Sequence, residues 1–558
     1  MKNKILMLLM LIGILACNEE FSETVEIGSL NPGALANEAG VNFALTAAYS
    51  AIDGVSGVSG GWTATGDNWW MDAISDDAHK GSTDGDQQDL FLLETHSWTT
   101  GNGYLFSKWR ALYAGANRAN AVIDLIGKID GDFSSQLAEA RFLRGHYYFE
   151  LQKMYGYIAY ISEVEFASLE FNQPNTGDVW AQIEADFEAA KAGLPATQGE
   201  PGRATKHAAA AYLGKAHLFQ GDWANALSEL NSVISSGRYA LLGEYGHNFR
   251  LAGENGSESV FAIQFDVAGG AFAPNGNGGG TLNFGGPNGW CCGFYQPTQD
   301  LVNAFQTSSG LPLIGTYNQS DVTNDQEIAS DAAFTPHAGT LDPRLDFTVG
   351  RRGIMYNGWD IHPGQAWVRA GDGDISGPYT PKKNVYHAGE TANMGAGNWG
   401  QQSSGINYHF IRYADVLLMA AEAAVETNDL TTALNYVNQV RARAKSSTPV
   451  SNDGGATPAA NYDIELYTAA DFGSQGAARD RVRMERRLEL AMEGHRLFDI
   501  RRWSEGVQIM NDYFANEART IPNFAGKANA MQDKHRLFPI PIGAIDVSAG
   551  ALTQNPNW

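Results

Sequence analysis

The sequence predicts a mainly α-helical fold, in which helical hairpins stack into a superhelix and one long region is rich in loops. Apolar residues between about 104 and 240 recur with the period of helices that face a core. Two segments, beginning at Leu213 and at Ala420, share one spacing of large and small residues. Residues 266–296 include ten glycines in 31 positions, a density that no useful helix tolerates.

Composition limits the classes of function. The 558 residues carry 38 Lys and Arg against 62 Asp and Glu, a formal net charge of −24. That balance argues against a general nucleic-acid binder and against adhesion to an anionic membrane surface. Apolar residues make up 44% of the chain, enough to bury a large core. The unusual feature of the composition is its content of 63 glycines and 13 tryptophans.

The first 16 residues have the pattern of an export signal. Two lysines precede an almost wholly apolar run over residues 5–15, which is too short to span a bilayer. The run ends in Ile14-Leu15-Ala16-Cys17, which resembles a bacterial lipobox. We therefore expect residues 1–16 to be removed and Cys17 to be acylated; the alternative is ordinary secretion, with Cys17 incidental.

The segment after the cysteine is expected to be a tether. Residues 17–37 carry little apolar periodicity. Asn18-Glu19-Glu20 resembles the surface-export signal of Bacteroidetes lipoproteins, because acidic residues follow the cysteine directly. The predicted location is the outer membrane, on the cell surface, with the lipid on Cys17 as the anchor.

Three helices are expected before residue 200. They cover about residues 104–126, 138–155 and 178–194, and each has apolar residues at helical spacing. Asp178 is a plausible N-cap of the third, and Pro195 lies just past its end.

A repeated helical hairpin follows. Leu213-Gly214 stands 13 residues before Ala226, and Ala420 stands 13 residues before Ala433. This spacing follows the tetratricopeptide pattern, in which small residues let two antiparallel helices approach closely. Gln220-Gly221-Asp222 is predicted to make the turn, since Gly ends helices and Asp begins them. Such repeats bury their apolar faces only by stacking.

Residues 266–400 interrupt this pattern as a loop-rich region with short strands. A β-like run at 260–265 marks its edge. Long loops inside a compact protein are usually functional or disordered, and the many aromatic residues argue against disorder. We therefore divide the mature chain into helical regions at 38–265 and 401–558 and a ligand-binding region at 266–400, packed as one globule.

Several motifs together resemble the SusD/RagB family of Bacteroidetes outer-membrane lipoproteins. They are spread over essentially the whole mature chain: Asn117-Arg118-Ala119-Asn120, Ala138 to Phe149, Ile411-Arg412-Tyr413-Ala414-Asp415-Val416-Leu417-Leu418-Met419, Glu485-Arg486-Arg487-Leu488-Glu489-Leu490 with Gly494-His495-Arg496-Leu497-Phe498-Asp499, Leu537-Phe538-Pro539-Ile540-Pro541 and the final Gln554-Asn555-Pro556-Asn557-Trp558.

The resemblance implies a fold and a role. The fold would be tetratricopeptide-like helical pairs with a loop-rich face. The role would be capture of oligosaccharides or other nutrients at the cell surface, without catalysis. The implied partner is a SusC-like TonB-dependent transporter, over which the lipoprotein sits as a lid.

The segment 485–503 is densely charged. Glutamates and arginines alternate along it, and Arg496 is three residues from both Glu493 and Asp499. An acid/base site is one interpretation. Ion pairs along a single helix that clamp the repeats are the better one, because pairs at this spacing lie side by side on a helix. The same interpretation holds for Arg412 and Asp415.

Signals for catalysis or metal binding are weak. Gly57-Val58-Ser59-Gly60-Gly61 fits a nucleophile pattern but lacks the flanking strand and helix that the pattern requires. Asp372 and Asp374 resemble the start of a calcium loop, yet its twelfth position is Lys383 instead of glutamate. A surface turn is favoured over calcium, and no cofactor is expected. Whether Cys291 and Cys292 are bonded is open.

Ligand binding is expected from the loops, because sugars need flat aromatic platforms and a few fixed polar groups. Eight of the 13 tryptophans lie outside the recognisable helices. The predicted contacts are those in polar, turn-rich surroundings: Trp69, Trp70, Trp290 and Trp359 as platforms, with Asn68, Asp76, Asp77 and Tyr295 as polar or edge contacts. For any single Trp, a buried core position is an equally good reading.

The acidic balance favours a neutral ligand over a polyanion, which the net charge would repel. The resulting prediction is a binder of neutral glycans, with a β-glucan such as laminarin as the first choice. A binder of peptides or other non-sugar nutrients is the alternative, and a glycoside hydrolase is a more remote one.

Overall fold

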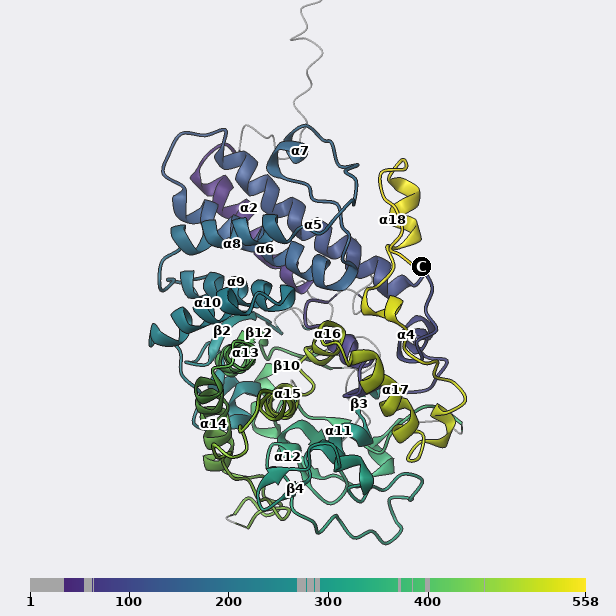
Figure 1. The fold of residues 1–558 in the computed structure, drawn as a ribbon. Helices are drawn as coiled ribbons and strands as arrows, with labels where there is room; N and C mark the ends of the chain where they lie inside the picture. The colour runs from purple at the N-terminus through teal and green to yellow at the C-terminus, as the bar shows by residue number, and fades with distance from the viewer. Residues whose placement is uncertain are drawn as a thin grey trace, which may run out of the picture.

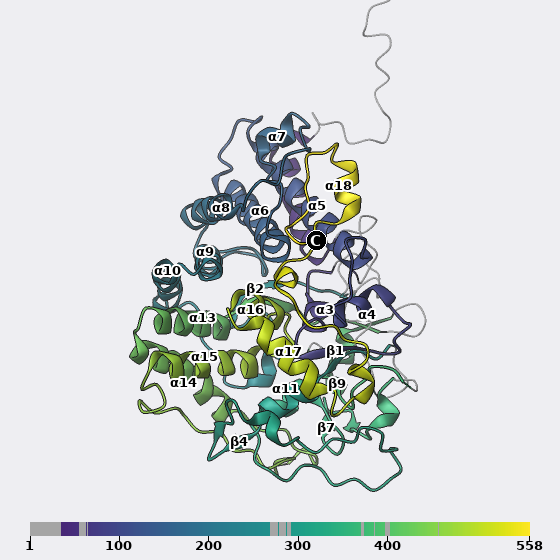
Figure 2. The ribbon, with the colours of Figure 1, turned by 45° about the vertical axis from the view of Figure 1, so that its right-hand side comes forward.

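The computed structural model describes residues 35–54, 63, 65–267, 277, 286, 292–369, 373–383, 385–396, 402–455 and 457–558. It has a stack of helices on one side and a region of loops and short strands on the other (Figure 1). Turning the molecule shows the helices α8, α10, α13 and α14 along one edge, and β1, β7 and β9 on the opposite side (Figure 2). The predicted mainly α, helical-repeat fold is confirmed.

Within the described ranges, nine helices form the stack: α2 (Glu38–Ser50), α5 (Gly103–Ile126), α6 (Ser134–Tyr155), α8 (Trp180–Gly193), α9 (Lys206–Gln220), α10 (Trp223–Ser235), α13 (Tyr413–Glu426), α14 (Leu430–Ser446) and α15 (Gln475–Leu490). From α5 to α10 each packs on the next of the series, and α10 then packs directly on α13. The superhelix is therefore continuous in space, although about 180 residues separate α10 from α13 in the sequence.

Small residues set the distance between paired helices, as predicted. A Cβ added at Gly214 on α9 would lie 2.8 Å from Leu230 on α10, so only glycine allows this approach. Gly221 ends α9 with a left-handed φ of 73°, and the Asp222 side chain caps α10 by accepting from Asn225 N. The predicted turn is confirmed. Asp178 is not the N-cap of α8; that position is Val179.

Six two-stranded antiparallel sheets lie among the described residues. The pairs are β1 (Ala78–Gly81) with β3 (Phe294–Pro297), β2 (Ser259–Ile263) with β12 (Tyr408–Arg412), β4 (Thr307–Ser308) with β5 (Leu311–Pro312), β6 (Val349–Gly350) with β9 (Thr380–Pro381), β7 (Met355–Tyr356) with β8 (Asp360–Ile361), and β10 (Met394–Ala396) with β11 (Gln402–Ser404).

The shorter helices are α3 (Trp69–Asp72), α4 (Gln88–Glu94), α7 (Glu163–Ala167), α11 (Gln299–Ala304), α12 (Leu345–Thr348), α16 (Arg496–Arg502), α17 (Gly506–Glu517) and α18 (Ile542–Val547). Short 3-10 turns lie at 51–53, 245–249, 251–253, 317–319, 365–367, 388–393, 522–524 and 533–536. Within the described ranges, no helix has the length and apolarity that crossing a membrane requires.

The charged segment 485–503 is not one helix. α15 ends at Leu490, the chain turns through Met492 and Gly494, both with positive φ, and α16 begins at Arg496. The prediction that Arg496 pairs along a helix with Glu493 and Asp499 is wrong, because this turn points the side chains toward distant segments.

Candidate functional site

Short elements bring the two predicted binding segments together. Trp69 opens α3, and Tyr295 lies on β3, which pairs with β1. The rings of Trp69 and Tyr295 meet edge to face with centroids 5.9 Å apart. The Tyr295 hydroxyl donates to Asp72 Oδ2 at 2.7 Å, and Gly494 N donates to the same oxygen at 2.8 Å. Tyr295 and Gly494 thus meet at the carboxylate of Asp72, although they lie about 220 and 420 residues from it in the sequence.

Most of the predicted contact residues are nevertheless interior. Six of them have at most 2% of their surface exposed: Asn68, Trp69, Trp70, Asp76, Asp77 and Tyr295. A side chain without exposed surface offers neither a ring face nor an oxygen to a ligand. The structure therefore places these six in a buried frame beneath the loops, and we call them, with Asp72, the loop frame.

Ion pairs hold the acidic part of the loop frame. Arg496 binds Asp76 with two hydrogen bonds of 2.7 and 2.8 Å, and Arg487 donates to Asp77 Oδ1 at 2.8 Å. Burial by itself raises the pKa of Asp76, but Arg487 and Arg496 outweigh it and lower that pKa to about 2. Asp72 lacks such a partner, so burial and the neighbouring Asp77 raise its pKa to about 7. These carboxylates are structural anchors of β1.

The backbone of the loop frame is strained at two positions. Asn68 and Tyr295 have φ values of 52° and 60°, a region that residues other than glycine seldom adopt. Asn68 Nδ2 donates to Glu150 Oε2 at 3.1 Å, which ties it to α6. Strain of this kind persists only where the surroundings over-determine it, and it is frequent beside binding sites.

The Trp359 side chain is partly exposed to solvent. Its Nε1 donates to the carbonyl oxygen of Tyr386 at 3.3 Å, and its ring meets Tyr386 edge to face at 6.3 Å. Trp367 packs against the same small apolar cluster and is also only partly buried. Trp359 is therefore the one predicted platform among the described residues that remains partly open to solvent.

Other predicted residues lie outside the described ranges: Cys17, Trp290, Cys291 and Asp372. Cys292 is described and is disulfide-bonded. Asp374 Oδ1 accepts from Asp84 N at 3.1 Å, and Asp84 Oδ1 accepts from Ile375 N at 2.8 Å, so the two aspartates tie two loops together. In the described part of the chain, no group of three or more His, Cys, Asp or Glu side chains is arranged for a metal ion.

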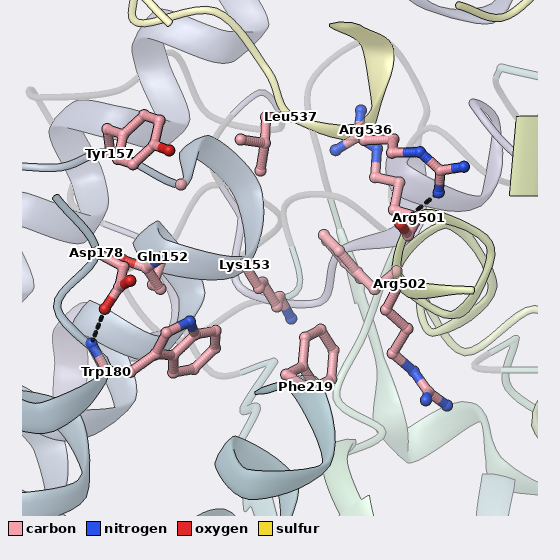
Figure 3. A pocket seen from close by; sticks show the side chains of 12 residues that line it. Gln152, Lys153, Tyr157, Asp178, Trp180, Phe219, Arg501, Arg502, Arg536 and Leu537 are labelled. Carbon is pink, nitrogen blue, oxygen red and sulfur yellow. Dashed lines mark hydrogen bonds between the residues drawn. The ribbon is translucent and has the colours of Figure 1, made fainter. Parts of the chain in front are cut away.

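Sequence reasoning missed two hollows. One is a cavity of about 300 Å³ between α6, the start of α8, the end of α9 and α16 (Figure 3). The other is a groove of about 390 Å³ where α5 and α18 meet the segment 159–173. Aromatic rings and amides share its wall: Phe106, Trp109, Tyr113, Phe171, Asn117 and Gln173. Helical spacing marks Trp109 as a core residue, and no local signal shows that a distant helix leaves a groove beside it.

Comparison with known proteins decides the family. The model of the SusD family matches residues 257–558, more than half of the chain. The chain belongs to the SusD family. A second model, described as starch-binding associating with outer membrane, matches residues 54–218, and this description places the family at the outer membrane.

Similar proteins agree with this assignment. SusD-like protein P2 of Formosa agariphila is 27% identical over 492 residues, 83% of each chain. A SusD-like carbohydrate binding protein of Bacteroides fragilis superposes with a TM-score of 0.70 at 23% identity, covering 93% of this chain and 99% of the other. A laminarin binding SusD-like protein superposes with a TM-score of 0.62 at 22% identity, covering 94% and 100%. These structural matches show a shared fold.

Proposed function

We propose that this SusD-family protein is a non-catalytic lipoprotein of the cell surface that captures oligosaccharides and passes them to a SusC-like TonB-dependent transporter. The observation that carries the proposal is the family match, which spans the loop-rich region and the C-terminal helices. The lipobox-like Cys17 supplies the anchor, and the 21 residues from Cys17 to Asn37 precede the first helix of the stack.

The proposed ligand is a neutral β-glucan of the laminarin type. A net charge of −24 disfavours polyanionic glycans, because an acidic surface repels them. Among proteins with this fold, one is a laminarin binding SusD-like protein. Another, from Bacteroides thetaiotaomicron, is a surface glycan-binding protein solved with laminarihexaose. Both support the choice without deciding it for this chain.

The proposed binding face is formed by two of the predicted platforms. Trp290 and Trp359 serve as aromatic platforms, since indole faces pack against the C–H faces of sugar rings. The loop frame holds β1 and β3 in place, and β3 begins four residues after Trp290. A pre-organised base lowers the entropy lost on binding.

Titration calorimetry with laminarin oligosaccharides tests this proposal. We expect binding by the full chain, at least tenfold weaker for Trp290→Ala and several-fold weaker for Trp359→Ala. Phe43→Ala is the matched control, because Phe43 on α2 is 59% exposed and lies outside the proposed face. Unchanged affinity in both tryptophan variants would refute the site.

The same panel separates the alternatives. Retardation in anionic polysaccharide gels with none in neutral glucans would refute the ligand class. Binding of peptides but of no glycan would favour the non-sugar alternative. Shortened oligosaccharides after long incubation would show a glycoside hydrolase.

A further inference from the structure

The cavity of Figure 3 is unusual for its charge. It is lined by Arg501, Arg502, Arg536 and Lys153, and Asp178 is the one carboxylate among the described residues of its lining. The three arginines approach from one side, and Trp180 and Tyr157 lie across from them (Figure 3). A cationic lining stands out in a chain with 24 more acidic than basic residues.

Three of the four cations already have partners. Lys153 Nζ lies 2.6 Å from Glu150 Oε1. Arg502 binds both carboxylate oxygens of Glu422, at 2.6 and 2.5 Å. Arg536 donates to the carbonyl oxygens of Arg501 and Trp503, at 3.0 and 2.8 Å, and to that of Ser504. None of these groups requires a ligand.

Arg501 is different. It is 7% exposed, and none of its three guanidinium nitrogens has a hydrogen-bond partner among the residues that the structure describes. The guanidinium carbon lies 3.9 Å from the ring centroid of Phe538, a contact that leaves the N–H groups unsatisfied. The neighbouring His535 supplies no counter-charge, and it adds no second positive charge, because burial, Lys534 and Arg501 itself lower its pKa to about 4 and leave the imidazole neutral at pH 7.

An unpaired buried charge is costly, and a buried donor without a partner calls for an explanation. Burial lowers the pKa of Arg501 to about 9, so the guanidinium is still charged at pH 7. A guanidinium takes carboxylates and other oxyanions with two parallel hydrogen bonds. The partner that completes this cavity is therefore an oxyanion.

The opposite wall of the cavity indicates which kind of molecule bears the anionic group. Trp180 and Phe219 are partly exposed, and their rings meet at 6.4 Å. Tyr157 is 41% exposed at the rim. Aromatic faces across from a cation suit a ring that bears an acidic group.

We propose that this cavity binds a small acidic saccharide, with the carboxylate on Arg501 and the sugar ring on Trp180. Because the Arg501 nitrogens have no solvent-exposed surface, binding requires this side chain to swing into the cavity. Trp290 and Trp359 are not among the residues that line the cavity, and the proposal does not depend on the proposed glucan face.

Titration calorimetry on the full chain, with sodium glucuronate, glucose and sodium sulfate at constant ionic strength, tests the proposal. Glucuronate should bind and glucose should not. Arg501→Gln should lower the glucuronate affinity at least tenfold. Arg519→Gln is the matched control, because its side chain is 48% exposed and outside the cavity. Saturating glucuronate should leave the laminarin affinity of the unmodified protein unchanged, which separates this site from the proposed function.

Asp178→Asn gives a readout that misfolding cannot mimic. It removes the cavity's one lining carboxylate, so glucuronate affinity should rise several-fold. Trp180→Ala should weaken glucuronate but not sulfate. Unchanged affinity in Arg501→Gln, or a loss in Asp178→Asn, would overturn the proposal. Equal affinity for sulfate and glucuronate, insensitive to Trp180→Ala, would overturn the sugar and leave a site for inorganic anions.

Discussion

The helical stack and the segments around α15 and α16 keep their order by different means. From α5 to α10, apolar side chains and small residues pack between helices that follow one another in the series, as where Phe142 on α6 meets Phe187 on α8 edge to face at 5.8 Å. Around α15 and α16, buried arginines join segments that are far apart in sequence. Arg412 alone contacts Glu258, Glu489 and Glu493.

The difference indicates where apolar packing and where buried ion pairs determine the arrangement of segments. Helices that follow one another find their partners through short connections and a shared apolar stripe. The loop-rich region has only two-stranded sheets among its described residues, so few backbone ladders fix its position. Buried ion pairs add little net stability, because desolvation offsets the attraction, but breaking one is expensive. We infer that they specify position here.

The largest expected effect on stability comes from a substitution that breaks the network of buried arginines. Glu489 is fully buried and accepts from Arg344 at 3.0 Å and Arg412 at 2.6 Å, and it also contacts Arg443. Glu489→Ala removes a carboxylate that three buried arginines share, so we expect a loss of about 3–5 kcal/mol in the free energy of unfolding, measured by urea denaturation.

Its matched control is the exposed pair Lys445–Glu465. Their side chains are 44% and 53% exposed, so solvent screens the attraction. Glu465→Ala should leave the unfolding midpoint unchanged. Equal losses in the two variants would contradict a role of burial.

The next effect is a pH dependence from His79. Its ring nitrogens lie 2.8 Å from Glu94 and 2.9 Å from Glu517, and although burial opposes the charge, these glutamates raise the pKa of His79 to about 9. A raised pKa stabilises the fold fully below pH 6.5, and the contribution fades as the pH rises toward 9. Roughly 3 kcal/mol should be lost over this range.

Urea unfolding of the wild type and of His79→Gln at pH 6, 7.5 and 9 measures this contribution. The stability difference between the two proteins should shrink as the pH rises. A difference independent of pH would exclude a charged imidazole.

A smaller effect tests packing in the stack. A Cβ at Gly115 on α5 would lie 2.3 Å from the ring of buried Tyr147 on α6. Gly115→Ala should therefore cost about 1–3 kcal/mol despite the better helix propensity of alanine. Gly127→Ala at the end of the same helix is the control, since it meets nothing closer than 3.5 Å and should be neutral or slightly stabilising. Thermal unfolding that ranks the two variants in the opposite order would refute the steric argument.

The smallest expected effect is a helix cap. The Asp429 side chain accepts from Thr432 N at 3.1 Å at the start of α14. Asp429→Ala should cost about 1 kcal/mol, read from the urea midpoint. Asp429→Ser keeps an acceptor and should retain most of the stability, and a full loss in that variant would show that the charge matters instead of the hydrogen bond.

Local patterns predicted the parts of the fold that are local. The period of apolar residues placed the helices of the stack, and the Gln220-Gly221-Asp222 turn was readable because its backbone geometry demands Gly and Asp. The charged segment after Glu485 was misread as one helix with internal pairs. Its arginines instead reach Asp76 and Asp415, about 420 and 70 residues away in sequence.

The candidate site shows the same limit. Polar, turn-rich surroundings suggested that Trp69 and Trp70 face solvent, but α3 lies under other segments, and Trp70 packs edge to face on Tyr104 at 5.4 Å. Burial of a short helix depends on what covers it, and the covering residues are distant in sequence. The cavity at Arg501 is equally invisible, since its walls come from α6, α8, α9 and α16.

The sequence by itself determined the fold class, the repeated hairpin and the family resemblance, because these depend on spacing within a few turns of chain. Tertiary structure alone decided which aromatic rings are buried, which carboxylate each arginine holds, and where Arg501 is left without a partner. Those outcomes depend on the meeting of segments hundreds of residues apart, and neither helical period nor residue type records that meeting.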